Sequence, residues 1–548
     1  MDRRDVVRYA IVGIPFAILI VFIVYPVISV IIRGLLSQPS VNLLEVINSP
    51  ITQRTLIFTI SQASVSTFLT IIIGLPGAFL IARIKFRGRW LVRAAIVVPF
   101  VLPPIAVVVG FIQMFGPYGF VDSIAMTILG TNQSVLNFAY GIIGILLAHV
   151  FYNIPLVILM VSSSLERLNP DLEDSAESLG ASKIQKLRHI IFPHIRSSLF
   201  ASGILVFLFC FMSFPIVLAL GERGIMTVEV QIWNAFRNFD YGEASALVLL
   251  QIIITMALAI SYIYLNRGAT DSSGETRSIR RIGLSDLELK EKILGSIYLI
   301  LILILIAGPI LALGRASIFD PTTGTYTLRG FENLLELGQG GGLIPLINSL
   351  YYGGLATILA IVLGIPLAYA HQQRGKTMPT LSSIMTLLPL GISSITIAYG
   401  LMLMIAVPLG LSFNPWPIII IAQTIIGLPF TVRSIEISLQ KIDQNILDQA
   451  ESLGASRLQK LFFVELPLLA PGILVGGVFA FAMAIGEMSA TLFIALPQNI
   501  TLSVLIYQQL GVRKFVEAGA AAVILVTLCF IAFLIIERIS EDSTGGML

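Results

Sequence analysis

Charged residues are scarce in this chain of 548 residues, and their scarcity excludes the soluble protein classes. Asp, Glu, Lys and Arg make up 12% of the sequence, whereas a soluble domain carries about 25%. Hydrophobic residues account for 56%, and the mean hydropathy is +0.92. No basic run is interleaved with aromatic residues, so the net charge of +3 gives no indication of nucleic-acid binding. The composition predicts a polytopic membrane protein.

Cysteine is almost absent, and the motifs of common enzymes are missing. Cys210 and Cys529 both fall in apolar stretches, which indicates packing residues and no disulfide framework or thiolate metal site. We find no His-Glu-x-x-His, Gly-x-Ser-x-Gly or paired-aspartate pattern. The nearest approach to a nucleotide-binding P-loop, at 370–377, has alanine in place of the first glycine and follows an apolar run. We therefore expect no catalytic residue, metal site or cofactor in this chain.

The sequence contains long stretches without charged residues, and these stretches predict an all-α membrane fold. A helix needs about 20 apolar residues to cross the hydrocarbon core. Twelve stretches near that length lie at residues 9–32, 55–82, 94–116, 140–164, 197–221, 244–266, 293–314, 344–372, 381–407, 416–432, 468–496 and 518–536. The first has the charged flank of a signal peptide but is too long for one, so we interpret it as a retained helix.

The basic residues divide unevenly between the connections and so predict an orientation. If the N-terminus is cytoplasmic, twelve spans return the C-terminus to the same side. The segments on that side then hold 26 of the 34 Lys and Arg residues. Such an excess is typical of cytoplasmic loops. We predict that both termini are cytoplasmic.

An internal repeat divides the chain into two similar halves. The segment 174–182 reappears as 448–456, at an offset of 274 residues, and nearer the start of each half the offset becomes 290. Six spans separate equivalent points, so both copies have the same orientation and are related by an axis along the membrane normal. The predicted units are a first repeat, a cytoplasmic linker and a second repeat, at residues 1–266, 267–292 and 293–548.

The repeated segments resemble the signature loop of bacterial and archaeal ABC importer permeases. That pattern is Glu-Ala-Ala, three residues, Gly, nine residues, Ile, any residue and Leu-Pro. The residues that carry the match are Asp174, Ser175, Ala176, Gly180 and Pro193 in the first copy and Asp448, Gln449, Ala450, Gly454 and Pro467 in the second. Asp replaces the family's Glu, and Ser175 and Gln449 replace its middle alanine. Each copy lies between the fourth and fifth spans of its half.

The resemblance implies a type I ABC importer permease fold and the import of a small solute. In this family the signature segment is a coupling helix, which implies two copies of a separate ABC ATPase subunit as partners. It also implies an extracytoplasmic solute-binding protein and a location in the lipid bilayer of a prokaryotic inner membrane. Small residues permit close approach, the glycines permit a sharp turn, and each proline starts the following span.

The whole chain resembles in particular the fused permease group that includes thiamine and ferric-iron importers. Segments 144–155 and 506–511 look like thiamine permeases, whereas 486–491 looks like a wider set that includes iron, sulfate and polyamine permeases. The resemblance therefore implies a solute that is thiamine-like or iron(III).

Polar residues at membrane depth are costly unless they face the interior or a water-filled path. Glu487 corresponds to Ser213 at the offset of 274, so the acid breaks the internal symmetry. We interpret both residues as candidates for the translocation path, with a buried packing role as the alternative for Glu487. His149 and Asn153 lie four residues apart and are interpreted as interhelical hydrogen-bonding partners. Polar packing is also expected of Gln62, Gln113, Gln251 and Gln423.

Two other functions remain open from the residues. An ion-coupled secondary transporter with twelve helices would normally carry several ionisable groups within the membrane, and here Glu487 is nearly alone. Such a transporter also has no use for paired coupling loops. An intramembrane enzyme would need a catalytic constellation that we do not find.

The predicted topology can be tested by cysteine labelling. Cysteines introduced at Ser182 and Thr131 should react with membrane-impermeant reagents from opposite faces, because an odd number of predicted spans separates the two positions. The unsubstituted protein gives the background from the two native cysteines. Labelling of both positions from one face would contradict the topology.

Overall fold

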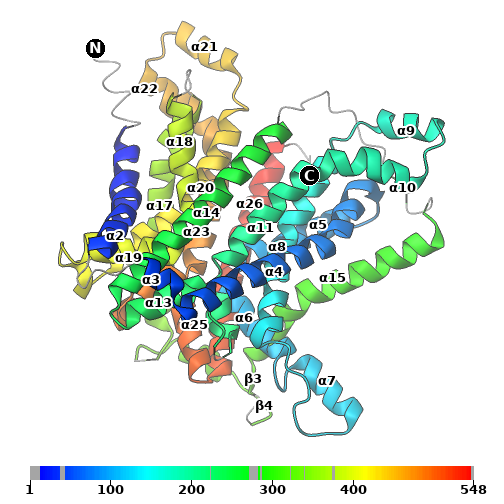
Figure 1. The fold of residues 1–548 in the computed structure, drawn as a ribbon. Helices are drawn as coiled ribbons and strands as arrows, with labels where there is room; N and C mark the ends of the chain where they lie inside the picture. The colour runs from blue at the N-terminus through cyan, green and yellow to red at the C-terminus, as the bar shows by residue number, and fades with distance from the viewer. Residues whose placement is uncertain are drawn as a thin grey trace.

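The apolar stretches fold as helices because lipid offers no hydrogen-bonding partner to a backbone N–H or C=O group. The structure is a computed structural model that describes the chain except for residues 1–12, 37–42, 223, 271–281, 284–286, 321–322, 339, 373–376 and 545–548. Among the described residues, 11 helices are long and apolar enough to cross a membrane. Figure 1 shows them packed side by side in one bundle.

The first half begins with a span at Gly13–Ile32. Its elements are η1 (Ile20–Val24), α2 (Tyr25–Leu36), α3 (Leu43–Asn48), α4 (Pro50–Arg83), β1 (Ile84–Lys85), α5 (Arg89–Val101), α6 (Pro104–Phe115), α7 (Phe120–Leu129), α8 (Gly141–Leu165), α9 (Pro170–Ser178), α10 (Lys183–Lys186), η2 (Leu187–Ile191), α11 (Phe192–Phe211), α12 (Pro215–Leu220), α13 (Val228–Arg237) and α14 (Tyr241–Thr270).

The second half has a closely similar order of elements. They are β2 (Ile282–Gly283), α15 (Leu289–Ala316), β3 (Phe319–Asp320), β4 (Thr325–Tyr326), α16 (Arg329–Asn333), α17 (Leu343–His371), α18 (Thr377–Leu387), η4 (Leu388–Gly391), α19 (Ser394–Leu401), η5 (Met402–Ala406), η6 (Leu411–Phe413), α20 (Trp416–Leu439), α21 (Gln444–Ser452), α22 (Arg457–Lys460), η7 (Leu461–Glu465), α23 (Leu466–Gly486), α24 (Ser489–Ile494), η8 (Pro497–Asn499), α25 (Leu502–Gly511) and α26 (Phe515–Thr544). The short strands pair β1 with β2 in parallel and β3 with β4 antiparallel.

The ninth expected span is present in pieces, which is why eleven long helices stand where twelve spans were expected. Residues 381–407 are divided among α18, η4, α19 and η5, and the third expected span, 94–116, is divided between α5 and α6. Proline explains both divisions. Pro103 and Pro104 at the first break and Pro389 at the second have no backbone N–H to continue a helix.

The linker between the halves lies largely outside the described residues. Among those that are described, α14 continues to Thr270 and α15 begins at Leu289, so both helices extend into the predicted linker. The strand β2 pairs with β1 and so ties the linker to the end of α4.

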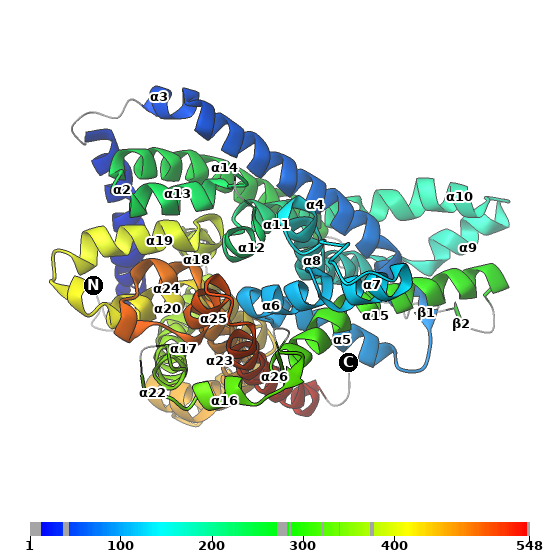
Figure 2. The same cartoon turned by 90° about the horizontal axis from the view of Figure 1, so that it is seen from below.

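The two halves are interlocked by their first spans. α2 packs between α14 of its own half and α19 of the other, and α15 packs between α26 of its own half and α6 of the other. Figure 2 shows α2 and α15 at opposite sides of the molecule, each against the other half. The helices approach closely at Gly110, where a Cβ would lie 2.2 Å from the Pro309 oxygen, and at Gly400, where it would lie 2.8 Å from Pro26 Cβ. These two glycines are equivalent at the offset of 290.

Both predicted coupling segments lie at one end of the bundle. Figure 1 shows α9 and α10 apart from α21 and α22, at the end where the first described span begins and α26 ends. α7 and the β3–β4 hairpin lie at the opposite end. The relative placement agrees with the predicted topology, and which end faces the cytoplasm stays a prediction.

The close packing between the halves predicts that replacing a helical glycine by alanine destabilises the protein at one position and stabilises it at another. Gly110→Ala should destabilise the protein by about 1–3 kcal/mol or more, because its Cβ would meet a backbone carbonyl that cannot turn aside. The matched control is Gly314→Ala in α15, where a Cβ has open space and where alanine should stabilise the helix by about 0.5–1 kcal/mol. The measurement is the thermal unfolding midpoint of each purified variant in detergent. Equal midpoints for both variants would contradict the close packing of α6 on α15.

Candidate functional site

A cavity of about 300 Å³ lies where four helix breaks meet at the centre of the bundle. The breaks separate α5 from α6, α11 from α12, η4 from α19 and α23 from α24. Residues flanking all four breaks line the cavity, namely Val101, Leu102, Pro103, Pro104, Met212, Ser213, Pro215, Ile392, Ser393, Ser394, Gly486, Glu487, Met488 and Ser489. Broken helices at membrane depth are tolerated where they are enclosed by protein or line a water-filled space.

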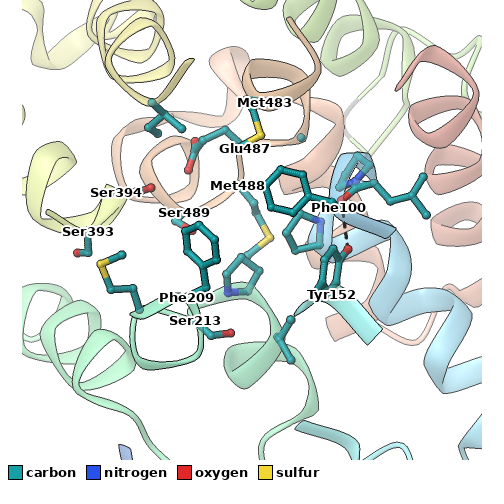
Figure 3. Close-up of a pocket in the computed structure, with 18 of the residues that line it drawn as sticks. Phe100, Tyr152, Phe209, Ser213, Ser393, Ser394, Met483, Glu487, Met488 and Ser489 are labelled. Atoms are coloured by element: carbon teal, nitrogen blue, oxygen red, sulfur yellow. Dashed lines mark hydrogen bonds between the residues drawn. The ribbon is translucent and has the colours of Figure 1, made fainter. Parts of the chain in front are cut away.

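The cavity lies between the halves, and equivalent positions line it from both. Leu102 corresponds to Ile392 at the offset of 290, and Ser213 corresponds to Glu487 at the offset of 274. The structure therefore brings together the two residues predicted for the translocation path. Figure 3 shows them on opposite sides of the cavity, with Met488 between them.

Glu487 is held at the start of the short helix α24. The Ala490 N–H donates to Oε1 at 2.7 Å, and the Thr491 N–H and hydroxyl both donate to Oε2 at 2.9 Å. The carboxylate thus satisfies N–H groups that a helix start leaves without partners. Glu487 is 8% exposed and lines the cavity, so its packing role and its position on the candidate path coexist.

Other buried polar residues connect helices, as the sequence predicts. The His149 Nδ1 lies 3.1 Å from the Ser66 hydroxyl on α4, and Asn153 donates to Cys210 Sγ on α11 at 3.5 Å. Gln62 donates to the Cys210 carbonyl at 2.9 Å. The His149 Nε2 is buried without a partner among the described residues, and so are both polar atoms of the Gln423 amide.

Sequence reasoning missed the burial of Glu229. This residue is 1% exposed in α13, and its Oε1 accepts a hydrogen bond from Gln251 Nε2 at 2.5 Å. Nothing in the sequence indicates this burial, because Glu229 falls between two predicted spans, and acidic residues are common in such connections. Its burial comes from the packing of α13 against α14, α4 and α19.

The first predicted coupling segment is a helix, a left-handed turn and a second helix. α9 ends in a Schellman motif, in which the Ala181 N–H donates to the Ala176 carbonyl at 2.9 Å and the Gly180 N–H to the Glu177 carbonyl at 2.9 Å. Gly180 has φ +82°, a conformation that side chains with a Cβ rarely adopt. Ser182 then starts α10 with a capping box closed by Gln185.

The second segment repeats this geometry. The Ala455 N–H donates to the Ala450 carbonyl and the Gly454 N–H to the Glu451 carbonyl, both at 3.0 Å, with Gly454 at φ +84°. Ser456 and Gln459 form the equivalent reciprocal hydrogen bonds. Two segments 274 residues apart therefore fold alike, because the same backbone-directed residues recur in both.

Each segment presents apolar side chains to the outside. Leu179 is 89% exposed and Leu453 is 88% exposed, each directly before the turn glycine. Ile184, Leu458 and Phe463 are exposed nearby. A groove of about 320 Å³ beside the first turn is lined by Ala176, Leu179, Gly180, Ala181, Gln185, Lys186, His189 and Ile190. Exposed apolar groups clustered in this way mark an interaction surface.

Ion pairs that the sequence analysis did not anticipate brace these segments. Lys186 pairs with Glu177 at 2.9 Å, and Lys460 pairs with Glu451 at 3.4 Å, so each pair bridges its turn. In the first half, Arg83 at the end of α4 also pairs with Glu173 on α9.

The prolines of the motif differ from expectation, because neither begins its helix. Pro193 is the second residue of α11 and Pro467 the second of α23, but the helical runs extend back to Lys183 and Leu458. A π-helical turn precedes each proline, η2 in the first half and η7 in the second. The wider turn accommodates the missing N–H and the crowding of a proline ring on the preceding turn.

The chain is similar to known transport proteins along most of its length. Residues 71–268 and 360–544 match the family described as binding-protein-dependent transport system inner membrane component. The thiamine transport system permease protein ThiP of Escherichia coli (strain K12) is 26% identical over 489 residues, which cover 88% of each chain. The putative ferric transport system permease protein FbpB 1 of Haemophilus influenzae is 26% identical over 492 residues, covering 86% of this chain and 76% of the relative.

A solved structure also matches part of the chain. It is a bacterial ABC transporter involved in the import of the acidic polysaccharide alginate, with a TM-score of 0.41, 15% identity, and coverage of 50% of this chain and 98% of that chain. The family match falls once in each half and includes both predicted coupling segments. The family match does not favour the alternative of an ion-coupled secondary transporter. The chain therefore belongs to the family of binding-protein-dependent transport system inner membrane components, and it is a permease subunit of an ABC importer made of two fused repeats.

Proposed function

We propose that this permease passes its solute through the central cavity and is driven by two copies of a separate ATPase subunit. The observation that carries the proposal is the pair of coupling segments, which have the same fold, expose apolar side chains and stand apart at one end of the bundle. Each segment offers one docking site. The residues proposed to couple are Asp174, Ser175, Ala176, Gly180, Pro193, Asp448, Gln449, Ala450, Gly454 and Pro467.

The orientation follows from this assignment. The ATPase is a cytoplasmic partner, so the end that carries α9 and α21 faces the cytoplasm, together with both termini. The opposite end, with α7 and the β3–β4 hairpin, receives the external solute-binding protein. The excess of Lys and Arg in the segments on the α9 side supports this placement. The chain itself needs no cofactor in this scheme.

The solute is proposed to be thiamine-like or iron(III), since relatives of both names match the chain over most of its length. The external binding protein delivers it, and Glu487 and Ser213 then meet it in the cavity. Their position on opposite walls of one cavity supports this role.

The coupling role predicts a loss of ATPase binding without a loss of folding. Gly180→Val or Gly454→Val places a β-branched side chain at positive φ, which costs about 1–3 kcal/mol locally and displaces the docking surface. Membrane insertion should be unchanged, whereas co-purification of the ATPase and uptake should fall several-fold. The double substitution should be more severe than either single one, because each segment serves its own ATPase copy.

A matched control separates docking from backbone strain. Gly130 also has positive φ, at +63°, and open space around a Cβ, but it ends α7 at the opposite end of the molecule. Gly130→Val should therefore retain the ATPase. Normal ATPase binding and transport by both coupling variants would show the assignment to be wrong.

The path role of Glu487 predicts a charge-dependent loss of uptake. Glu487→Gln removes the charge, so uptake of a cationic solute should fall on the order of tenfold, equivalent to about 1.4 kcal/mol, with ATPase association intact. Thr491→Val is the control, because it removes one hydrogen bond to the carboxylate and keeps the charge. An equal loss of uptake in both variants would assign Glu487 to helix capping alone.

A further inference from the structure

Aromatic rings from both halves converge on the central cavity. Phe100 lies 6.5 Å between ring centroids from Phe209 and 6.5 Å from Phe430. All three line the cavity and are half-buried, as is Tyr152, whose hydroxyl donates to the Leu102 carbonyl at 3.2 Å. Figure 3 shows Phe209 on one side of Met488 and Phe100 and Tyr152 on the other. Ring faces attract flat rings and cations.

Methionine adds a second kind of soft contact. Met212, Met483 and Met488 line the same cavity, and thioether groups are polarisable and adapt to irregular or planar ligands. Figure 3 places Met488 centrally, with Met483 beside Glu487. The walls are therefore suited to an organic solute with a planar, partly apolar body.

The formal charge of the lining is negative. Glu487 is the one Asp or Glu among the lining residues, and no Lys or Arg accompanies it. Each helix break places the negative end of one helix and the positive end of the next beside the cavity, so their dipoles largely offset. The first N–H groups of α24 and α19 are also occupied, by Glu487 and by the Ser393 hydroxyl. A cation is therefore favoured over an anion.

The cavity also offers polar groups at its edge. The unpartnered His149 Nε2 belongs to a lining residue that is 1% exposed, and Asn153 and Ser213 also line the cavity. A charged imidazolium there would need acceptors on both nitrogens, and only Ser66 is present. The neutral ring is thus suited to hydrogen bonding with a ligand's ring nitrogen or amino group.

A hard metal ion finds no comparable site. Such ions are held by several oxygen ligands, whereas the lining supplies one carboxylate whose two oxygens already accept three hydrogen bonds. In the part of the chain that the structure describes, no group of three or more His, Cys, Asp and Glu residues could hold a metal.

We infer that the cavity selects a flat, aromatic organic cation and not a bare or hydrated iron(III) ion. The rings and methionines take the planar body, Glu487 attracts the positive charge, and His149 bonds to a polar edge. The inference rests on the proposed function, in which this cavity is the solute path, and it chooses between the two solute classes left open there.

Cysteine labelling tests the charge selectivity without requiring a known substrate. The permease–ATPase complex carrying Ser213→Cys is treated during ATP hydrolysis with a trimethylammonium or a sulfonate methanethiosulfonate reagent. The same reagents on Gln133→Cys, an exposed loop position, correct for intrinsic reactivity. The corrected preference for the cationic reagent should be about tenfold, because a negatively lined cleft concentrates cations. Adding Glu487→Gln should abolish it.

Protection of the same cysteine tests the ligand class. Thiamine should slow the labelling of Ser213→Cys, whereas thiochrome, its flat neutral oxidation product, and iron(III) citrate at equal concentration should not. Phe100→Leu should raise the thiamine concentration that gives half-maximal protection by about tenfold. Phe100→Tyr should leave that concentration nearly unchanged, because a ring face remains.

The outcomes separate this inference from the proposed function. The proposed function would be overturned if the unsubstituted protein showed no ATP-driven uptake or did not associate with the ATPase. With both intact, the inference is overturned by an anionic preference, by no labelling at Ser213→Cys, or by protection with iron(III) citrate and not with thiamine. Equal protection by thiochrome would also overturn the requirement for a cation.

Discussion

The hydrogen-bonding demand of the backbone in lipid is the constraint on which this structure depends. A helix satisfies that demand along its length, so any break at membrane depth must be enclosed by protein. Among the described residues, four breaks between helices face one cavity between the two halves. Interlocking by α2 and α15 keeps the halves together around that cavity. The helix breaks, where backbone hydrogen bonding is interrupted, therefore lie at the centre of the molecule.

The same constraint explains why polar side chains gather at the breaks. Glu487 accepts the free N–H groups of α24, and Ser393 accepts one from α19. In the first half, prolines at the start of α6 and α12 remove N–H groups that would otherwise lack partners. The second repeat thus satisfies the N–H groups at its helix starts partly with the carboxylate of Glu487, whereas the first repeat uses prolines that have no N–H. The cavity is therefore asymmetric although the fold is duplicated.

The predicted coupling segments at the end of the bundle use local backbone hydrogen bonds that tolerate exposure to water. The Schellman turn and the capping box satisfy the backbone from within each segment, so Leu179 and Leu453 are free to remain exposed. The π-helical turns before Pro193 and Pro467 join each segment to a membrane helix without a break. A rigid connection of this kind would carry motion of a docked partner toward the cavity.

The sequence by itself determined the membrane class, the duplication, the local fold of the two repeated segments and the equivalence of Glu487 to Ser213. These depend on composition, on exact repeats and on glycine or capping residues whose effects are local, so they need no knowledge of distant contacts. Tertiary structure alone decided that the breaks in the third and ninth spans meet those at Ser213 and Glu487. It also decided that Glu229 is buried and that Phe100, Phe209 and Phe430 share one cavity. Those features arise from helices far apart in the chain, whose packing no local pattern encodes.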